Sequence, residues 1–145
     1  MELSSLYRDT ILKHARSPQN EGVLENPDYK ARAVNKLCGD ELELTLSLEG
    51  DQIKEARLNV RGCAVVQAAS SMMSELLSGL TLQQASERGA QLKACLQDGA
   101  TPDQDLASLL PLITLKDHRA RHRCVLLPWE ALDLCALEKD QHLNA

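Results

Sequence analysis

The stretch Glu41-Leu42-Glu43-Leu44-Thr45-Leu46-Ser47-Leu48-Glu49-Gly50-Asp51-Gln52-Ile53 sets the fold class of this chain. Its leucines alternate with polar residues up to Leu48, and this period of two predicts a half-buried antiparallel strand. Residues 49–52 form a turn, so we expect a return strand over residues 53–60, with Ala56, Leu58 and Val60 on one face. Residues 31–35 predict a short third strand, which places the sheet at about residues 31–60.

Helical patterns occur in the sequence both before and after the residues of the predicted sheet. Residues 3–16 carry apolar side chains at helical spacing and end before Ser17-Pro18, which predicts an amphipathic helix. Residues 64–77 contain neither glycine nor proline, and Gly79 follows them as a C-terminal cap would. Thr81 is placed to cap the next helix, which continues through Leu96 despite an internal glycine.

The rest of the chain is also expected to be helical, up to about residue 137. A short helix is predicted over residues 103–109, and a last one after Cys124, with Leu132 and Leu137 on its buried side. Strands followed by a run of helices indicate an α+β protein, in which a small antiparallel sheet of about three strands packs against several helices. The length of 145 residues predicts a single domain, residues 1–145.

Composition restricts the classes of partner and compartment. The chain has no Phe and one Trp, so its core must be aliphatic. A net charge of −5 without a dense basic run argues against nucleic acid or an anionic membrane as the main partner. No segment approaches the ~18 apolar residues of a spanning helix, and the first residues are not signal-like, so we expect a cytoplasmic protein. Five cysteines at irregular spacing do not indicate a disulfide framework.

Three cysteines lie beside turn-formers or charges instead of within apolar stripes. Cys38 and Asp40 flank Gly39, and in extended backbone their side chains would point the same way. Cys63 is expected where the return strand ends and a helix begins, a position that favours a thiolate. Cys124 follows a basic run, which would lower its pKa if the cations lie close.

If these four side chains converge, they form a soft, anionic pocket suited to a thiophilic metal. The alternatives are an Asp that serves the turn, a small buried residue at position 63, and cysteines that never meet. The basic segment Arg119–Arg123 is either a solvated loop or an electrostatic wall beside Cys124. Cys95 and Cys135 lie at helical intervals from leucines and predict core packing.

The histidines carry weaker signals. His118 and His122 flank the basic run, and His122 is either a further metal ligand or a plain surface residue. His14 and His142 are near the two ends of the chain and are expected to be exposed to solvent.

These residues resemble the iron–sulfur cluster assembly family of IscU, SufU and the NifU N-terminal domain. The resemblance covers about residues 3–137 and rests on three motifs in order. The motifs are Leu6-Tyr7-Arg8 with Ile11, Leu12, His14, Asn35 and Cys38-Gly39-Asp40; Gly62-Cys63 with Ala68, Ser71, Met72 and Met73; and Arg121 with Cys124 and Trp129.

The long segment between the second and third motif cysteines, and the Trp that follows, are similar to the SufU branch. IscU proteins have a His directly before the third cysteine, whereas this chain has Arg123. The family usually has Pro after the Asn of the first motif, whereas Lys36-Leu37 stand here.

The resemblance implies Zn²⁺ bound by Cys38, Asp40, Cys63 and Cys124, and sulfur received from a SufS-type cysteine desulfurase. Cys38 would be the sulfur acceptor, released when a partner histidine replaces it on zinc, and Arg121 would assist docking or ligand exchange. The sulfur would pass to downstream scaffold or acceptor proteins, in a sulfurtransferase-type relay and not by a free-standing enzyme. Two alternatives are a scaffold that builds a transient [2Fe–2S] cluster in the same pocket and a structural zinc module.

Overall fold

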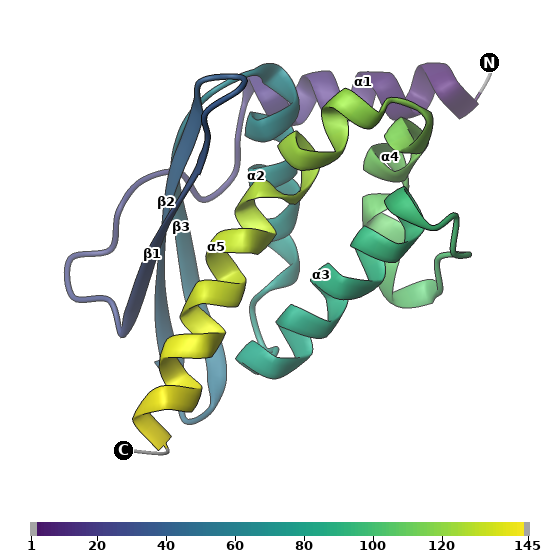
Figure 1. Cartoon of the computed structure of the whole chain (residues 1–145). Coiled ribbons are helices and arrows are strands. Elements are labelled where there is room, and N and C mark those ends of the chain that lie inside the picture. The colour runs from purple at the N-terminus through teal and green to yellow at the C-terminus, as the bar shows by residue number, and fades with distance from the viewer. Residues whose placement is uncertain (1–2, 144–145) are drawn as a thin grey trace.

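A computed structural model describes residues 3–143 and contains one three-stranded sheet at one side of the molecule, with helices packed beside it (Figure 1). The elements in chain order are α1 (Leu3–Arg16), β1 (Tyr29–Asn35), β2 (Asp40–Glu49), β3 (Gln52–Arg61), α2 (Ala64–Leu76), α3 (Leu82–Gln97), the 3₁₀ helix η1 (Gln104–Leu109), α4 (Leu110–Ile113), the 3₁₀ helix η2 (Thr114–Asp117) and α5 (Arg119–Leu143). The α+β prediction is confirmed.

The sheet is antiparallel throughout, in the order β1-β2-β3. Leu42, Leu44 and Leu46 are buried, as their alternation with polar residues predicts. A register irregularity after Ser47 pairs Leu48 with Ile53 and leaves an extra residue on β3. This bulge turns Ile53 to the buried face that Ala56 and Leu58 share.

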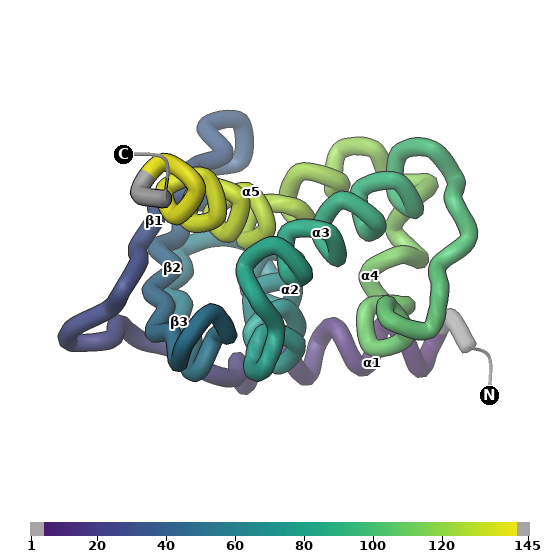
Figure 2. Tube along the Cα trace, turned by 90° about the horizontal axis from the view of Figure 1, so that it is seen from below, coloured from purple at the N-terminus to yellow at the C-terminus, as the bar shows by residue number. Residues whose placement is uncertain are grey.

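Two helices cover one face of the sheet, α2 against β3 and α5 against β1 and β2. Figure 2 shows the sheet on one side of the molecule, α2 and α5 beside it, and α3 and α4 farther from it. Helix α1 packs against α2 and α4, and α3 packs against the outer side of α5. The buried core is aliphatic apart from Trp129 in the described chain, as the composition predicts.

Several helix boundaries follow local signals in the sequence. Helix α1 spans the residues that its apolar spacing predicts. At the start of α3, the Thr81 side chain accepts a hydrogen bond from the Gln84 amide, and the Gln84 side chain accepts one from the Thr81 amide. This capping box satisfies two backbone donors that the helix leaves free, which fixes where α3 begins.

Two predictions about the last helix are wrong. It begins at Arg119 and not after Cys124, because the segment Arg119–Arg123 contains no helix breaker and continues into α5. Leu132 is fully buried, but the Leu137 side chain is 54% exposed. These two leucines are five positions apart, and at 3.6 residues per turn they lie on different faces of the helix.

Candidate metal centre

The turn between β1 and β2 presents Cys38 to solvent. The Cys38 amide donates to the Asn35 carbonyl at 3.3 Å, and Gly39 adopts φ +72°, a conformation that L side chains rarely take. The prediction that Cys38 and Asp40 align through extended backbone is therefore wrong. They still face one site, because the tight turn brings the Cys38 thiol back over the start of β2.

Asp40 is the first residue of β2, and it is 1% exposed. Its Oδ1 accepts a hydrogen bond from the Cys63 amide at 2.9 Å. A Cβ on Gly62 would lie 2.6 Å from this oxygen and 2.5 Å from Cγ1 of Val66. Glycine at position 62 is therefore what allows the carboxylate to lie against the backbone between β3 and α2.

Cys63 lies at the N-cap of α2, at the junction of strand and helix that the sequence predicts. Its thiol is half-buried and donates to Oδ2 of Asp40 at 3.9 Å. The N-terminus of α2 favours a negative charge at this position because free amides and the helix dipole both point toward it.

Cys124 is fully buried in the second turn of α5, and its thiol donates to Oδ2 of Asp40 at 3.6 Å. The sequence predicts a lowered pKa for this thiol only if the neighbouring cations lie close, and no such lowering is found. Burial raises the pKa of the Cys124 thiol to about 12, with further contributions from Cys63 and Asp40. Its basic neighbours are exposed: the Arg123 guanidinium donates to the Val34 carbonyl at 3.0 Å, away from the sulfur.

The ligand atoms of Cys38, Asp40 and Cys124 all lie within 4.8 Å of one another, an arrangement that can hold a metal ion. Cys63 adjoins this group through Asp40 and Cys124. Among the side chains of residues 5–141, no basic group forms an ion pair with Asp40. A buried carboxylate without a cationic partner, beside a thiol whose pKa is raised, favours a positive charge at this position. A thiophilic cation bound there would lower the pKa of the Cys124 thiol.

The histidines lie elsewhere. His122 is 8% exposed, and its Nε2 forms a 2.7 Å hydrogen bond with the Lys116 carbonyl, so it is neither a surface residue nor one of the metal-holding group. His118 is exposed. His14 is not solvated as expected, because its Nδ1 lies 2.7 Å from the Ser71 hydroxyl. The side chain of His142 lies outside the described residues.

The sequence analysis named three neighbours of the site without predicting a role for them. Gly62 makes room for the carboxylate of Asp40, as its position directly before a cysteine at a strand end could have indicated. Asn35 is 2% exposed, and its Oδ1 has no hydrogen-bond partner within the described part of the chain. Leu37, next to Cys38, is 93% exposed. The only sequence signal at this position was that Lys36-Leu37 follow Asn35, where the family usually has Pro.

The fold and this donor set define a family. The model of the NifU-like N terminal domain matches residues 6–110, and the chain belongs to this family. The match includes Cys38, Asp40 and Cys63 but ends before Cys124, whose approach to the other three rests on the position of α5.

Within the family, the chain is similar to the zinc-dependent sulfurtransferase SufU of Bacillus subtilis, with 32% identity over 90% of this chain and 89% of the relative. It is 26% identical to the iron–sulfur cluster assembly scaffold protein IscU of Thermotoga maritima, over 91% of this chain and 93% of the relative. A crystal structure of a putative iron–sulfur cluster assembly scaffold protein for the SUF system from Fervidobacterium islandicum superposes with a TM-score of 0.83. This chain and the Fervidobacterium protein are 27% identical, and the match covers 92% of this chain and 98% of that protein.

Proposed function

We propose that this chain accepts persulfide sulfur from a SufS-type cysteine desulfurase and relays it to the scaffold or acceptor proteins of iron–sulfur cluster assembly. The observation that carries the proposal is the exposure of Cys38 beside the buried Asp40 and Cys124, with their ligand atoms within 4.8 Å. Three sulfurs and a carboxylate gather at a surface where one thiol can be reached by a partner. The similarity to a zinc-dependent sulfurtransferase supports this assignment.

Cys38, Asp40, Cys63 and Cys124 are the residues that would hold Zn²⁺, because cysteine thiolates and aspartate carboxylates are both zinc ligands and zinc takes four of them. When bound, zinc would keep these thiols ionised near neutral pH. Zinc also lacks redox chemistry, so it would not oxidise the thiols that surround it.

Once Cys38 is released from the metal, the bonds that change are those of Cys38 and the donor persulfide alone. The Cys38 thiolate attacks the terminal sulfur of the donor, the donor's S–S bond breaks, and a new S–S bond forms on Cys38. The donor cysteine leaves as a thiolate. The terminal sulfur keeps its proton as it moves to Cys38. One sulfur atom moves without net oxidation or reduction.

Arg121 is exposed in the first turn of α5, three residues before Cys124. In this position its guanidinium is available to a docked partner, and we assign it an assisting role in docking. Leu37 projects from the same turn as Cys38 and would be among the first side chains that the partner meets.

The direct test is sulfide release by the desulfurase in the presence of Cys38→Ala. We expect stimulation to be lost, while Cys95→Ala, which changes a core thiol away from the site, retains it. Full stimulation by Cys38→Ala would rule out Cys38 as the acceptor.

The main rival function is that of a scaffold for a [2Fe–2S] cluster in the same pocket, because thiolates also suit iron–sulfur clusters. The IscU relative favours this alternative. Anaerobic purification separates the two: a coloured protein with thiolate-to-iron absorption supports the scaffold, and a colourless protein with one zinc supports the relay. A structural zinc module would instead unfold in Asp40→Ala, whereas the relay predicts that this variant folds and fails in transfer.

A further inference from the structure

A groove lies between α3 and α5, which pack against each other. It has a volume of about 530 Å³ at the end nearer the N-terminus of α5 and continues into a second hollow of about 250 Å³. We call it the α3–α5 groove and define it by Lys93, Arg119, Arg123, Leu126, Trp129 and Glu130.

One end of this groove is basic. Lys93 and Arg119 are exposed, and neither forms an ion pair with any residue between 3 and 143. Arg123 adds a third cation, which is partly neutralised by Glu130 at 3.5 Å. The N-terminus of α5, a helix of 25 residues, contributes further positive potential. A chain with a net charge of −5 therefore has unpaired cations gathered in one hollow.

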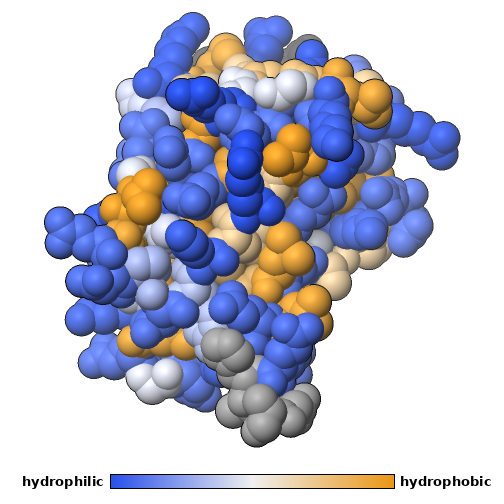
Figure 3. Space-filling model, turned by 60° about the vertical axis from the view of Figure 1, so that its left-hand side comes forward, coloured by the Kyte–Doolittle hydropathy of each residue, from blue (hydrophilic) through white to orange (hydrophobic). Residues whose placement is uncertain are grey.

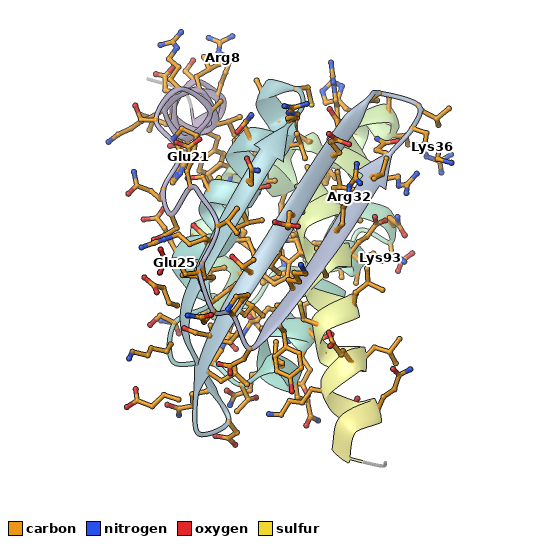
Figure 4. The ribbon with its side chains drawn as sticks, turned by 90° about the vertical axis from the view of Figure 1, so that its left-hand side faces the viewer. Arg8, Glu21, Glu25, Arg32, Lys36 and Lys93 are labelled. Carbon is orange, nitrogen blue, oxygen red and sulfur yellow. The ribbon has the colours of Figure 1, made fainter. Side chains whose placement is uncertain are left out.

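The positions of several charged side chains also show a difference between the basic groove and other parts of this acidic chain. Figure 4 shows Lys93, Arg32 and Lys36 on one side of the molecule, and Glu21 and Glu25 on the opposite side. Arg32 is ion-paired with Glu41, so it adds little net charge, whereas Lys36 and Lys93 are free to attract an anion. An acidic ligand would therefore be drawn to the face that includes the groove.

The second hollow has a mixed lining of apolar residues and the acidic residues Glu130 and Asp133. Leu126 and Trp129 line it, and they are 8% and 2% exposed. Gly89 of α3 makes room for the indole ring, because a Cβ there would lie 2.9 Å from Cε3 of Trp129. The Trp129 Nε1 is buried without a hydrogen-bond acceptor in the described chain, although a buried indole N–H normally has one.

We propose that the α3–α5 groove binds an acidic segment of a partner protein, with carboxylates on Lys93 and Arg119 and an apolar side chain over Leu126 and Trp129. A chain segment fits better than a small anion, because the groove continues beyond its cations into the second hollow, which Leu126 and Trp129 line. Figure 3 shows hydrophobic residues as small separate patches among hydrophilic ones on the face it displays, so a broad apolar interface is not visible there.

The groove adjoins the cysteine centre but does not include it. Arg123 lies in the groove, immediately precedes Cys124 and donates to Val34, which is close to the turn that carries Cys38. A bound segment would hold its protein beside the cysteines. Binding at the groove does not depend on sulfur transfer, so its test is independent of the proposed function.

Trp129 is the only tryptophan of the chain, and its fluorescence can report binding directly. Helix α3 has 16 residues and is about 24 Å long, so an extended peptide of about eight residues spans it. The probe is a synthetic peptide in which glutamates flank leucines, titrated into the zinc-loaded full chain. We expect a saturable change in Trp129 fluorescence that weakens as salt is added.

The decisive variant is Lys93→Glu with Arg119→Glu, which should weaken binding at least about tenfold, or 1.4 kcal/mol. The matched control is Arg8→Glu with Lys13→Glu on α1, which changes the net charge equally at exposed positions outside the groove and should bind as the wild type does. Circular dichroism checks that both variants fold.

Three results would overturn the proposal. The first is the absence of a saturable signal with the glutamate peptide. The second is equal binding by the groove variant, or by a peptide with glutamine in place of each glutamate. The third is the same fluorescence change with inorganic phosphate alone at comparable concentration, which would assign the groove to a small anion.

Discussion

Replacing Gly62 with alanine tests whether the position of Asp40 sets metal affinity. The added Cβ would lie 2.6 Å from the carboxylate Oδ1, whereas ordinary contact begins at 3.4 Å, so the oxygen must move by about 0.8 Å. The same Cβ would lie 2.5 Å from Cγ1 of Val66. Metal–ligand distances tolerate only about 0.2 Å, so a shift of this size removes Asp40 from a position where it can act as a ligand.

Two effects should follow from Gly62→Ala. Overpacking should lower the free energy of unfolding of the metal-free protein by about 1–3 kcal/mol. Displacement of Asp40, with loss of its hydrogen bond from the Cys63 amide, should lower zinc affinity by about 10–100-fold. Urea denaturation measures the first effect, and competition with a chromophoric chelator measures the second.

Two controls separate these causes. Gly99→Ala changes an exposed glycine with φ +69° and open space around its Cβ, so it should cost about 1 kcal/mol of stability and leave zinc affinity unchanged. Adding Val66→Ala to Gly62→Ala relieves the contact of the new Cβ with Val66 but not its contact with Asp40. Zinc affinity should therefore stay low in the double variant. If Gly62→Ala folds and binds zinc as tightly as the wild type, the reasoning about Asp40 is refuted.

Three further predictions concern stability and docking. Burial and, to a lesser extent, Glu138 raise the pKa of the Cys135 thiol to about 12 from 9.0. The unfolded chain therefore loses this proton first, and stability falls as pH rises above 9.0. Between about pH 8 and about pH 10.5 the loss should be about 2 kcal/mol greater in the wild type than in Cys135→Ala, by urea denaturation at both pH values. An equal loss in both proteins would exclude this thiol as the cause. Leu37→Asp should weaken binding to the desulfurase by about tenfold, since burying a leucine contributes about 1.5–3 kcal/mol, with zinc content unchanged. Calorimetry with the purified enzyme measures this, and unaltered affinity would mean that Leu37 stays outside the interface. Removing metal with a chelator should lower the melting temperature reversibly, because a ligand at 100 times its Kd stabilises by about 2.7 kcal/mol. A melting temperature that changes neither with chelator nor with added zinc would argue against a bound metal.

In the part of the chain that the structure describes, no helix is both long and apolar enough to cross a membrane.

Local features of the sequence were sufficient for most of the architecture. The alternating leucines of β2, the span of α1 and the capping box at Thr81 each depend on residues within a few positions of one another. Cys95 and Cys135 were correctly predicted as core residues from their helical spacing, and they are 2% and 0% exposed. Such patterns are readable because secondary structure has a short, fixed period.

The candidate metal centre depends on contacts that no local pattern contains. Cys124 meets Asp40 across 84 residues because α5 crosses the sheet beside α2, and spacing along the chain does not predict that crossing. The same packing raised a thiol pKa that neighbouring arginines alone would have lowered. It also allowed Cys38 to reach the site through a left-handed glycine and not through extended backbone. Periodicity shows which face of an element is buried, but the packing of distant elements sets which side chains share a site and what surrounds them.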